Sequence, residues 1–206
     1  MIKIGGTDLL NEFDLDEALA KVGETIELCA CVHSVKQMSG FAFVSLRTAR
    51  YVIQSVYSEA DCSDPLDEVR EGCFVKVTAV VKKEERARNG IELTLKSIKI
   101  MSKPTEDYPL HVSKRRLGCS LEVNLDNRSV ALRNPFERAA FKFQEGVAEA
   151  FRRFMLDNKF TEIHTPKIVA QGAEGGANIF HLDYFQKNAF LNQSPQFYKQ
   201  TAVAFF

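Results

Sequence analysis

The amino-acid sequence predicts an all-β barrel in the first half of the chain and a mixed α and β segment in the second half. Five runs rich in β-branched and aromatic residues follow one another in the first half, as expected of strands. These runs cover residues 24–35, 41–47, 51–57, 73–82 and 91–100. The second half instead contains a long helical pattern, followed by short strand-like runs around a glycine-rich loop.

Composition sets few limits on the function. The chain has 206 residues, of which 27 are Lys or Arg and 27 are Asp or Glu, so its net charge indicates no nucleic-acid partner. No apolar run reaches the roughly 20 residues that a membrane span needs, and we expect no membrane contact. The five cysteines are odd in number and include no Cys-x-x-Cys spacing. We therefore expect reduced thiols, a cytoplasmic protein and no metal site.

The order of elements in the first half is that of one small barrel. A short helix is expected over residues 14–23, before the first strand, with Asp14 as its cap. A second helix of one to two turns is expected over residues 64–72, because Asp64 can cap it and Pro65 suits its first position. Five strands with a helix between the third and fourth are the order of an OB-fold, a barrel that binds oligonucleotides on its second and third strands.

The second predicted strand separates into two faces. One face holds Ala42, Val44 and Leu46, and the other holds Phe41, Phe43 and Ser45. If the first set fills the barrel, the two phenylalanines face outward, where an aromatic ring can stack on an unpaired base. The alternative is that both rings pack beneath a neighbouring loop or domain.

Residues 105–125 are linker-like, and a well-marked helix starts after them. Asn134 can cap this helix, Pro135 suits its first position, and Glu137 lies three residues after the cap. Apolar residues then recur at helical spacing to about residue 158. Such a stripe is more often a core or interface surface than a cofactor site.

Short strands and a loop are expected after this helix. One strand covers residues 160–166, where Pro166 closes it, and two more cover residues 179–185 and 189–193. Between them, residues 171–178 form a glycine-rich loop. This loop lacks the Gly-Lys-Ser/Thr ending of a phosphate-binding loop, so its spacing alone indicates only a flexible connection.

A final helix is expected from Ser194 and Pro195 onward. Gln196 and Lys199 are three residues apart and therefore share one face of that helix. On spacing alone, such a pair is typical of a solvated helix edge.

Three segments of the second half resemble the opening of the catalytic domain of aspartyl-tRNA synthetases, a family of class II aminoacyl-tRNA synthetases. They read FTEIHTPKI (160–168), AEGGANIFHLDYF (173–185) and AFLNQSPQFYKQ (189–200), and they match that family in order and spacing. The second and third strands, FAFVSLR and YVIQSV, resemble the same family's anticodon-binding barrel. The resemblance covers nearly the whole chain.

The resemblance implies a fold class and a domain order. We expect an OB-fold anticodon-binding domain over residues 1–104, a linker over residues 105–125, and the start of a class II catalytic domain over residues 126–206. That catalytic domain has an α+β fold, with an antiparallel sheet and flanking helices. The family's motifs 2 and 3 lie beyond the last residue of this sequence, so the chain alone is expected to be inactive.

Asparaginyl-tRNA synthetases share both folds and are the nearest alternative. The aspartyl enzymes tend to read E-G-G-A and Q-S-P-Q-x-x-K, which Ala177, Pro195 and Lys199 match. The asparaginyl enzymes tend to read E-G-G-S and Q-S-S-Q, without the lysine. A lysine ammonium pairs with a side-chain carboxylate, whereas a neutral amide gains little from it. A catalytically inactive, stand-alone RNA-binding module is a second alternative.

The resemblance implies roles for five residues of the amino-acid pocket. Gln196 and Lys199 would hold the substrate aspartate, with Lys199 on its side-chain carboxylate. Glu174 would approach its α-ammonium group. Gly175 and Gly176 would let the loop move over the site, because glycine accepts backbone angles that other residues resist.

The resemblance also implies an anticodon site and a dimer motif. Phe43 would stack on an anticodon base, Gln54 would read a base edge, and Glu92 in the last strand would act similarly. The helix from Pro135 and the strand ending at Pro166 resemble motif 1, which forms the homodimer interface. Related enzymes usually carry basic residues before the Val-His pair of the first strand, where this chain has two cysteines. Anticodon binding is therefore expected to be weak or supported elsewhere.

The implied reaction attaches L-aspartate to tRNA in two steps. Aspartate first reacts with ATP to give aspartyl-adenylate, and the tRNA then accepts the aspartyl group. The full-length enzyme would use ATP and Mg²⁺, neither of which is expected to bind this chain tightly. The implied RNA partner is the aspartate tRNA, and whether the asparagine tRNA is a second substrate stays open.

Overall fold

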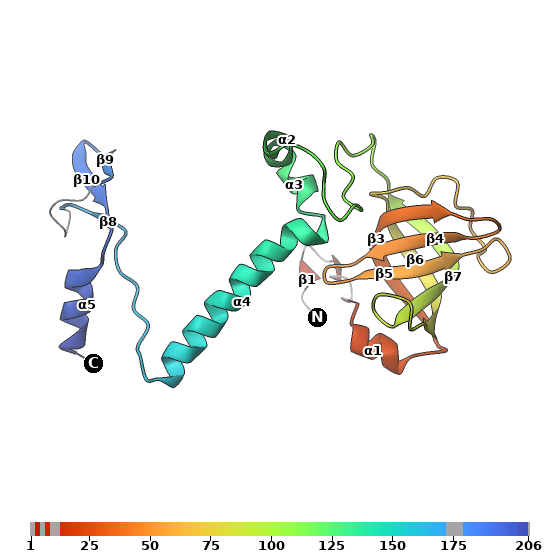
Figure 1. Ribbon diagram of the computed structural model, residues 1–206, viewed down its shortest axis with the longest axis horizontal. Helices are drawn as coiled ribbons and strands as arrows, with labels where there is room; N and C mark the ends of the chain where they lie inside the picture. Colours follow the sequence, from red (N-terminus) through yellow and green to blue (C-terminus); the bar gives the residue numbers. More distant parts are fainter. Residues whose placement is uncertain (1–2, 5–6, 9–12, 172–178, 206) are drawn as a thin grey trace. The chain divides into compact units, whose positions relative to one another are not determined.

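The computed structural model describes residues 3–4, 7–8, 13–171 and 179–205 (Figure 1). The chain divides into two compact units, Met1–Ala139 and Ala140–Phe206. Helix α4 (Pro135–Asp157) begins in the first unit and continues in the second.

Five strands of the first unit close into a barrel in the order β3–β4–β5–β7–β6 (Figure 1). They are β3 (Thr25–Gln37), β4 (Ala42–Arg47), β5 (Val52–Tyr57), β6 (Phe74–Lys83) and β7 (Ile91–Ser102). Neighbouring strands are antiparallel, except that β5 and β7 pair in parallel. The predicted all-β barrel with an OB-fold strand order is confirmed.

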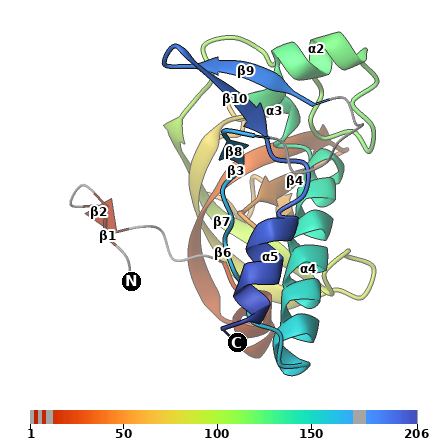
Figure 2. The ribbon, with the colours of Figure 1, turned by 90° about the vertical axis from the view of Figure 1, so that its left-hand side faces the viewer.

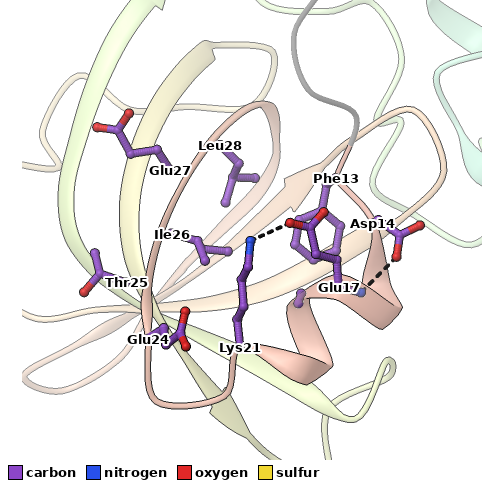
Figure 3. Close-up of a pocket in the computed structure, with 10 residues that line it drawn as sticks. Phe13, Asp14, Glu17, Lys21, Glu24, Thr25, Ile26, Glu27 and Leu28 are labelled. Carbon is purple, nitrogen blue, oxygen red and sulfur yellow. Dashed lines mark hydrogen bonds and ion pairs between the residues drawn. The ribbon is translucent and has the colours of Figure 1, made fainter. Parts of the chain in front are cut away.

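Short elements precede the barrel. They are β1 (Lys3–Ile4), β2 (Thr7–Asp8) and α1 (Leu15–Ala20). The Asp14 carboxylate caps α1, as predicted, by accepting the Glu17 N–H at 2.9 Å. A groove of about 510 Å³ lies between α1 and β3. Lys21 forms an ion pair with Glu17 there at 2.5 Å, and Figure 3 shows this contact among the residues that line the groove. This ion pair raises the pKa of Lys21.

Residue alternation along each strand builds the barrel interior. Ala42, Val44 and Leu46 of β4 are fully buried, as predicted, while Phe43 and Ser45 between them are partly exposed. The same alternation buries Leu28, Ala30 and Val32 of β3 and Val75, Val77, Ala79 and Val81 of β6. Burial of these apolar side chains is the main favourable contribution to folding, so it decides which strand face becomes the outer surface.

The helix predicted over residues 64–72 is wrong, because this segment folds into turns. The Asp64 carboxylate accepts the Ile98 N–H of β7 at 2.9 Å instead of capping a helix. Leu66 and Val69 both insert into the barrel core. Contacts with distant strands therefore outweigh the local helix-start signal.

The segment between the barrel and α4 contains a small apolar cluster of its own. Leu110, Leu117 and Ala131 are buried together, close to α2 (Leu121–Asp126) and α3 (Arg128–Ala131). The barrel is tied to this segment by Arg47 of β4, whose buried guanidinium donates to the Arg133 carbonyl at 2.9 Å.

Asn134 caps α4 as predicted and also fastens the preceding segment. Its side-chain oxygen accepts the N–H groups of Phe136 at 2.8 Å and Glu137 at 3.3 Å. Its side-chain nitrogen donates to the carbonyls of Val112 at 2.9 Å and Lys114 at 2.6 Å. All four bonds come from one amide that is 1% exposed.

The apolar stripe of α4 is solvent-exposed in this chain. Phe143, Val147, Phe151 and Phe154 are each more than half exposed. An exposed apolar stripe of this kind is typical of an interface. Of the helices that the structure describes, none combines the length and hydropathy needed to cross a membrane.

A three-stranded antiparallel sheet and one helix follow α4. Figure 2 shows the hairpin of β9 (His181–Tyr184) and β10 (Lys187–Leu191), and β8 (Ile168–Val169) pairs with the other edge of β10. Helix α5 (Gln196–Val203) comes last, where a final helix is predicted.

The strand predicted over residues 160–166 is wrong. The chain is irregular there, and β8 begins only after Pro166. A strand forms only where a neighbour completes its hydrogen bonds, and none of the described strands pairs with these seven residues.

His33 lies at an irregularity in β3, where the pairing with β4 shifts register between Val32 and Ser34. Its side chain is 7% exposed, and Nδ1 has no hydrogen-bond partner in the part of the chain that the structure describes. Burial, helped by the positive charges of Arg47 and Arg88, lowers the pKa of His33 to about 4. The imidazole is therefore neutral at pH 7.

We predict that His33 makes the barrel less stable in mild acid. The pKa of His33 is about 4 in the folded chain and 6.5 ordinarily, so below pH 6.5 the unfolded chain binds a proton that the folded chain does not. The free energy of unfolding should fall as the pH drops from about 6.5 to about 4, by up to about 3 kcal/mol. Urea unfolding of the wild type and of His33→Gln across this range measures the effect. If the free energy of unfolding changed with pH by the same amount in the two proteins, the predicted role of His33 would be contradicted.

We also predict that Asn134→Ala destabilises the first unit by about 2–4 kcal/mol, because it removes a cap and leaves two buried carbonyls without this donor. Asn127→Ala is the matched control, since the Asn127 side chain makes one hydrogen bond, to the Val123 carbonyl. Urea unfolding followed by circular dichroism gives both values. A similar decrease in the free energy of unfolding of the two variants would show that the Asn134 hydrogen bonds stabilise the chain no more than the Asn127 bond does.

Candidate nucleic-acid interface and amino-acid pocket

The outer face of β4, β5 and β7 brings together the three residues predicted to bind an anticodon. Strand pairing places Ser45 opposite Gln54, and Gln54 opposite Glu92. Phe43 lies two residues before Ser45 on β4 and therefore on the same face. Phe43, Gln54 and Glu92 thus share one surface of the barrel.

A short hydrogen bond orients the polar part of this surface. The Gln54 side-chain nitrogen donates to the Glu92 carboxylate at 2.6 Å. Glu92 is 8% exposed, whereas Gln54 is half-buried at the surface. This contact with a buried side chain holds the Gln54 amide in one orientation. The amide oxygen and second N–H of Gln54 can then meet the edge of a base.

The aromatic part of the surface is a pair of rings. Phe41 and Phe43 meet edge to face, with 5.2 Å between ring centroids and 86° between ring planes. Both rings are partly exposed. The edge contact with Phe41 restrains the Phe43 ring, and a restrained, accessible ring is suited to stacking on a base.

Two lysines flank this surface, and the sequence analysis missed both. Lys36 of β3 lies opposite Phe43, and Lys82 of β6 lies opposite Glu92. Both side chains are exposed. The register shift between Val32 and Ser34 brings Lys36, rather than its neighbour, to Phe43. A chain of zero net charge therefore has a local basic footprint, which is what phosphate contacts require.

The predicted amino-acid pocket is only partly described. Gln196 and Lys199 lie in the first turn of α5, three residues apart, and both side chains are exposed. The Pro166 carbonyl accepts the Asn192 side-chain N–H at 3.2 Å, just before α5. Glu174, Gly175 and Gly176 fall within residues 172–178 and lie outside the described residues.

No metal cluster is apparent in the described ranges, where no three side chains of His, Cys, Asp or Glu are placed to hold an ion. All five cysteines are free thiols.

The chain matches two family models. Residues 26–101 match the family described as OB-fold nucleic acid binding domain, and residues 120–205 match the family described as tRNA synthetases class II (D, K and N). The chain belongs to the class II tRNA synthetases. The first match coincides with the β3–β7 barrel of this synthetase chain, and the second runs from α2 through α5.

Individual relatives agree with this family. The synthetase chain is 34% identical over 186 residues to the aspartate–tRNA(Asp/Asn) ligase of Archaeoglobus fulgidus, covering 88% of this chain and 43% of that protein. It is 40% identical over 184 residues to the ligase of the same name from Deinococcus radiodurans, covering 89% of this chain and 41% of that protein. It thus spans less than half the length of these relatives.

A solved structure is also similar. The asparaginyl-tRNA synthetase of Pyrococcus horikoshii, complexed with asparaginyl-adenylate, matches with a TM-score of 0.78 and 25% identity, covering 95% of this chain and 45% of that chain. The predicted family and fold class are therefore confirmed, since both the barrel and the class II segment have independent matches.

Proposed function

We propose that this chain works in an aspartate–tRNA ligase, in which the barrel binds the tRNA anticodon and the segment after it supplies part of the aspartate pocket. The observation that carries the proposal is the juxtaposition of Gln54, Glu92 and a partly exposed Phe43 on one barrel face. The relatives are named aspartate–tRNA(Asp/Asn) ligase, which supports aspartate as the amino-acid substrate.

Each part of the barrel face has a separate task in this proposal. Phe43 offers a ring for stacking, which is tolerant of base identity. Gln54 offers a donor and an acceptor to one base edge, which discriminates among bases. Lys36 and Lys82, on the strands at either side, offer charge to the phosphates, which raises affinity without adding specificity.

The aspartate pocket rests on α5. Lys199 supplies an ammonium group for the side-chain carboxylate of aspartate, and Gln196 lies beside it on the same helix face. An asparagine side chain would leave the Lys199 charge without a partner, so this residue favours aspartate over asparagine. Glu174, Gly175 and Gly176 complete the pocket in the proposal.

ATP and Mg²⁺ belong to the reaction that the class II family implies, and no described residue is assigned to either. The asparagine tRNA is included as a second RNA substrate, because the relatives' names give both tRNAs. A cytoplasmic location is part of the same proposal.

A homodimer is part of the proposal as well. The exposed stripe of Phe143, Val147, Phe151 and Phe154 on α4 gives a second copy an apolar surface to cover. Pro166 lies after this helix, at the entry to β8, where the resemblance puts the end of the dimer motif.

The stacking role of Phe43 predicts that Phe43→Ala weakens binding of an anticodon stem-loop RNA by roughly 1–3 kcal/mol. The measurement is fluorescence anisotropy with the whole chain at one fixed salt concentration. Phe74→Ala is the matched control, because Phe74 is also a partly exposed phenylalanine but lies on β6, away from this face. Equal RNA affinities of wild type and Phe43→Ala would indicate that Phe43 only packs against its neighbours and does not stack on a base.

The role of Lys199 predicts that Lys199→Met lowers kcat/KM for aspartate roughly 100-fold or more, because an ion pair with the substrate is lost. Aspartate-dependent ATP–pyrophosphate exchange measures this, with the protein expressed from its complete reading frame. Lys187→Met, an exposed lysine of β10, is the control and should keep its activity. Activation of asparagine in preference to aspartate by the wild type would favour the asparaginyl alternative.

A further inference from the structure

Two cysteines of the barrel share its outer surface. β3 pairs with β6 in unbroken register from Thr25 to Cys31, so alternate residues of this stretch point to opposite faces. Leu28 and Ala30 are buried, and Cys29 and Cys31 are therefore directed outward, where both are partly exposed. The two thiols are neighbours on one strand face.

This spacing suits a shared ion better than a disulfide. Residues two apart on a strand lie about 7 Å from each other, whereas a disulfide needs its Cβ atoms within roughly 3.5–4.5 Å. A bond from metal to sulfur is about 2.3 Å for zinc, so one ion can join sulfur atoms up to roughly 4.6 Å apart. Side-chain rotation at both cysteines can bring the sulfur atoms into that range without moving the strand.

A basic residue lies opposite each cysteine on the neighbouring strands. Lys76 of β6 lies opposite Cys29, and Arg47 of β4 lies opposite Cys31. The Glu27 carboxylate lies 3.0 Å from the Lys76 ammonium and is the main cause that raises the pKa of Lys76. Cys29 makes a smaller contribution in the same direction, so the ammonium and the Cys29 side chain are close enough to interact electrostatically. Lys76 is already paired with Glu27. A Cu(I) ion held by two thiolates has a net charge of −1, and Arg47 opposite Cys31 carries a charge of the opposite sign.

We propose that Cys29 and Cys31 form a two-thiolate site for a soft monovalent metal ion of the Cu(I) type. Soft thiolate ligands select Cu(I), and two thiolates are a sufficient ligand set for that ion. Zinc prefers four ligands and would gain less from this pair. On binding, each thiol loses a proton to solvent, two sulfur–copper bonds form, and no electron is transferred.

The site is independent of the proposed aminoacylation function. Both thiols lie on β3, and Cys31 comes before the register shift that leads to Lys36 and the RNA-binding face. Neither residue has a part in the Phe43, Gln54 and Glu92 surface.

The test is an anaerobic titration of the whole reduced chain with Cu(I) delivered from a bathocuproine chelator. Wild type should take up one ion per chain at this site, seen as a thiolate–copper absorption band in the ultraviolet. Cys29→Ser and Cys31→Ser should each lose that ion. Cys119→Ser should retain it, because Cys119 is a free and similarly exposed cysteine in a different part of the first unit.

The proposal is overturned if either single variant at position 29 or 31 keeps the ion, or if Cys119→Ser loses it. If the wild type bound Zn²⁺ as tightly as Cu(I), the choice of a two-coordinate ion would also be overturned. Circular dichroism of each variant shows whether the barrel is intact, and Cys29→Ala and Cys31→Ala repeat the test with a second side chain. RNA binding of all variants is expected to stay at the wild-type value, which separates this result from the anticodon proposal.

Discussion

The parallel pairing of β5 with β7 closes the barrel, and the surface that we assign to RNA depends on it. Gln54, Ser55 and Val56 pair with residues 92–94, although almost forty residues separate the two strands in sequence. The inward members of this pairing, Ser55 and Leu93, are fully buried in the core. The outward members, Gln54 and Glu92, are joined by the 2.6 Å hydrogen bond. The same strand pairing therefore closes the core and orients the Gln54 amide.

The irregularity at His33 has a comparable influence on β3. Before it, the strand follows the regular register that keeps Cys29 and Cys31 outward. After it, the register against β4 moves by one residue, and Lys36 comes to lie beside Phe43. The cost is a buried imidazole whose Nδ1 makes no hydrogen bond to any described residue. Such a cost is tolerated where a bulge redirects a functional side chain.

Local patterns were sufficient for the five strands of the barrel, but not for the pairing between them. The alternation in β4 correctly separates Ala42, Val44 and Leu46 from Phe43, since inside and outside are decided residue by residue. The helix signal at Asp64 fails because its carboxylate binds the Ile98 N–H, 34 residues away. Lys36 and Lys82 could not be assigned to the RNA face, because their positions depend on register between strands. The joint roles of Gln54 and Glu92 came from the family resemblance, and the pairing now gives them a shared surface.

The two parts of the chain differ in how they are stabilised. Among the described residues, Ala189 is the single buried hydrophobic residue beyond Ala139, while the first unit contains all the others. The barrel therefore buries its own core, whereas most large apolar side chains of α4 and several of the β8–β10 sheet are exposed. Apolar surface of that extent is stabilised only when further protein covers it. In the homodimer that we propose, a second copy of the same helix covers α4, because a two-fold interface pairs one apolar stripe with itself. The surface proposed for the anticodon therefore lies on a domain with its own core, whereas the proposed amino-acid pocket lies in a unit whose large apolar side chains are mostly exposed.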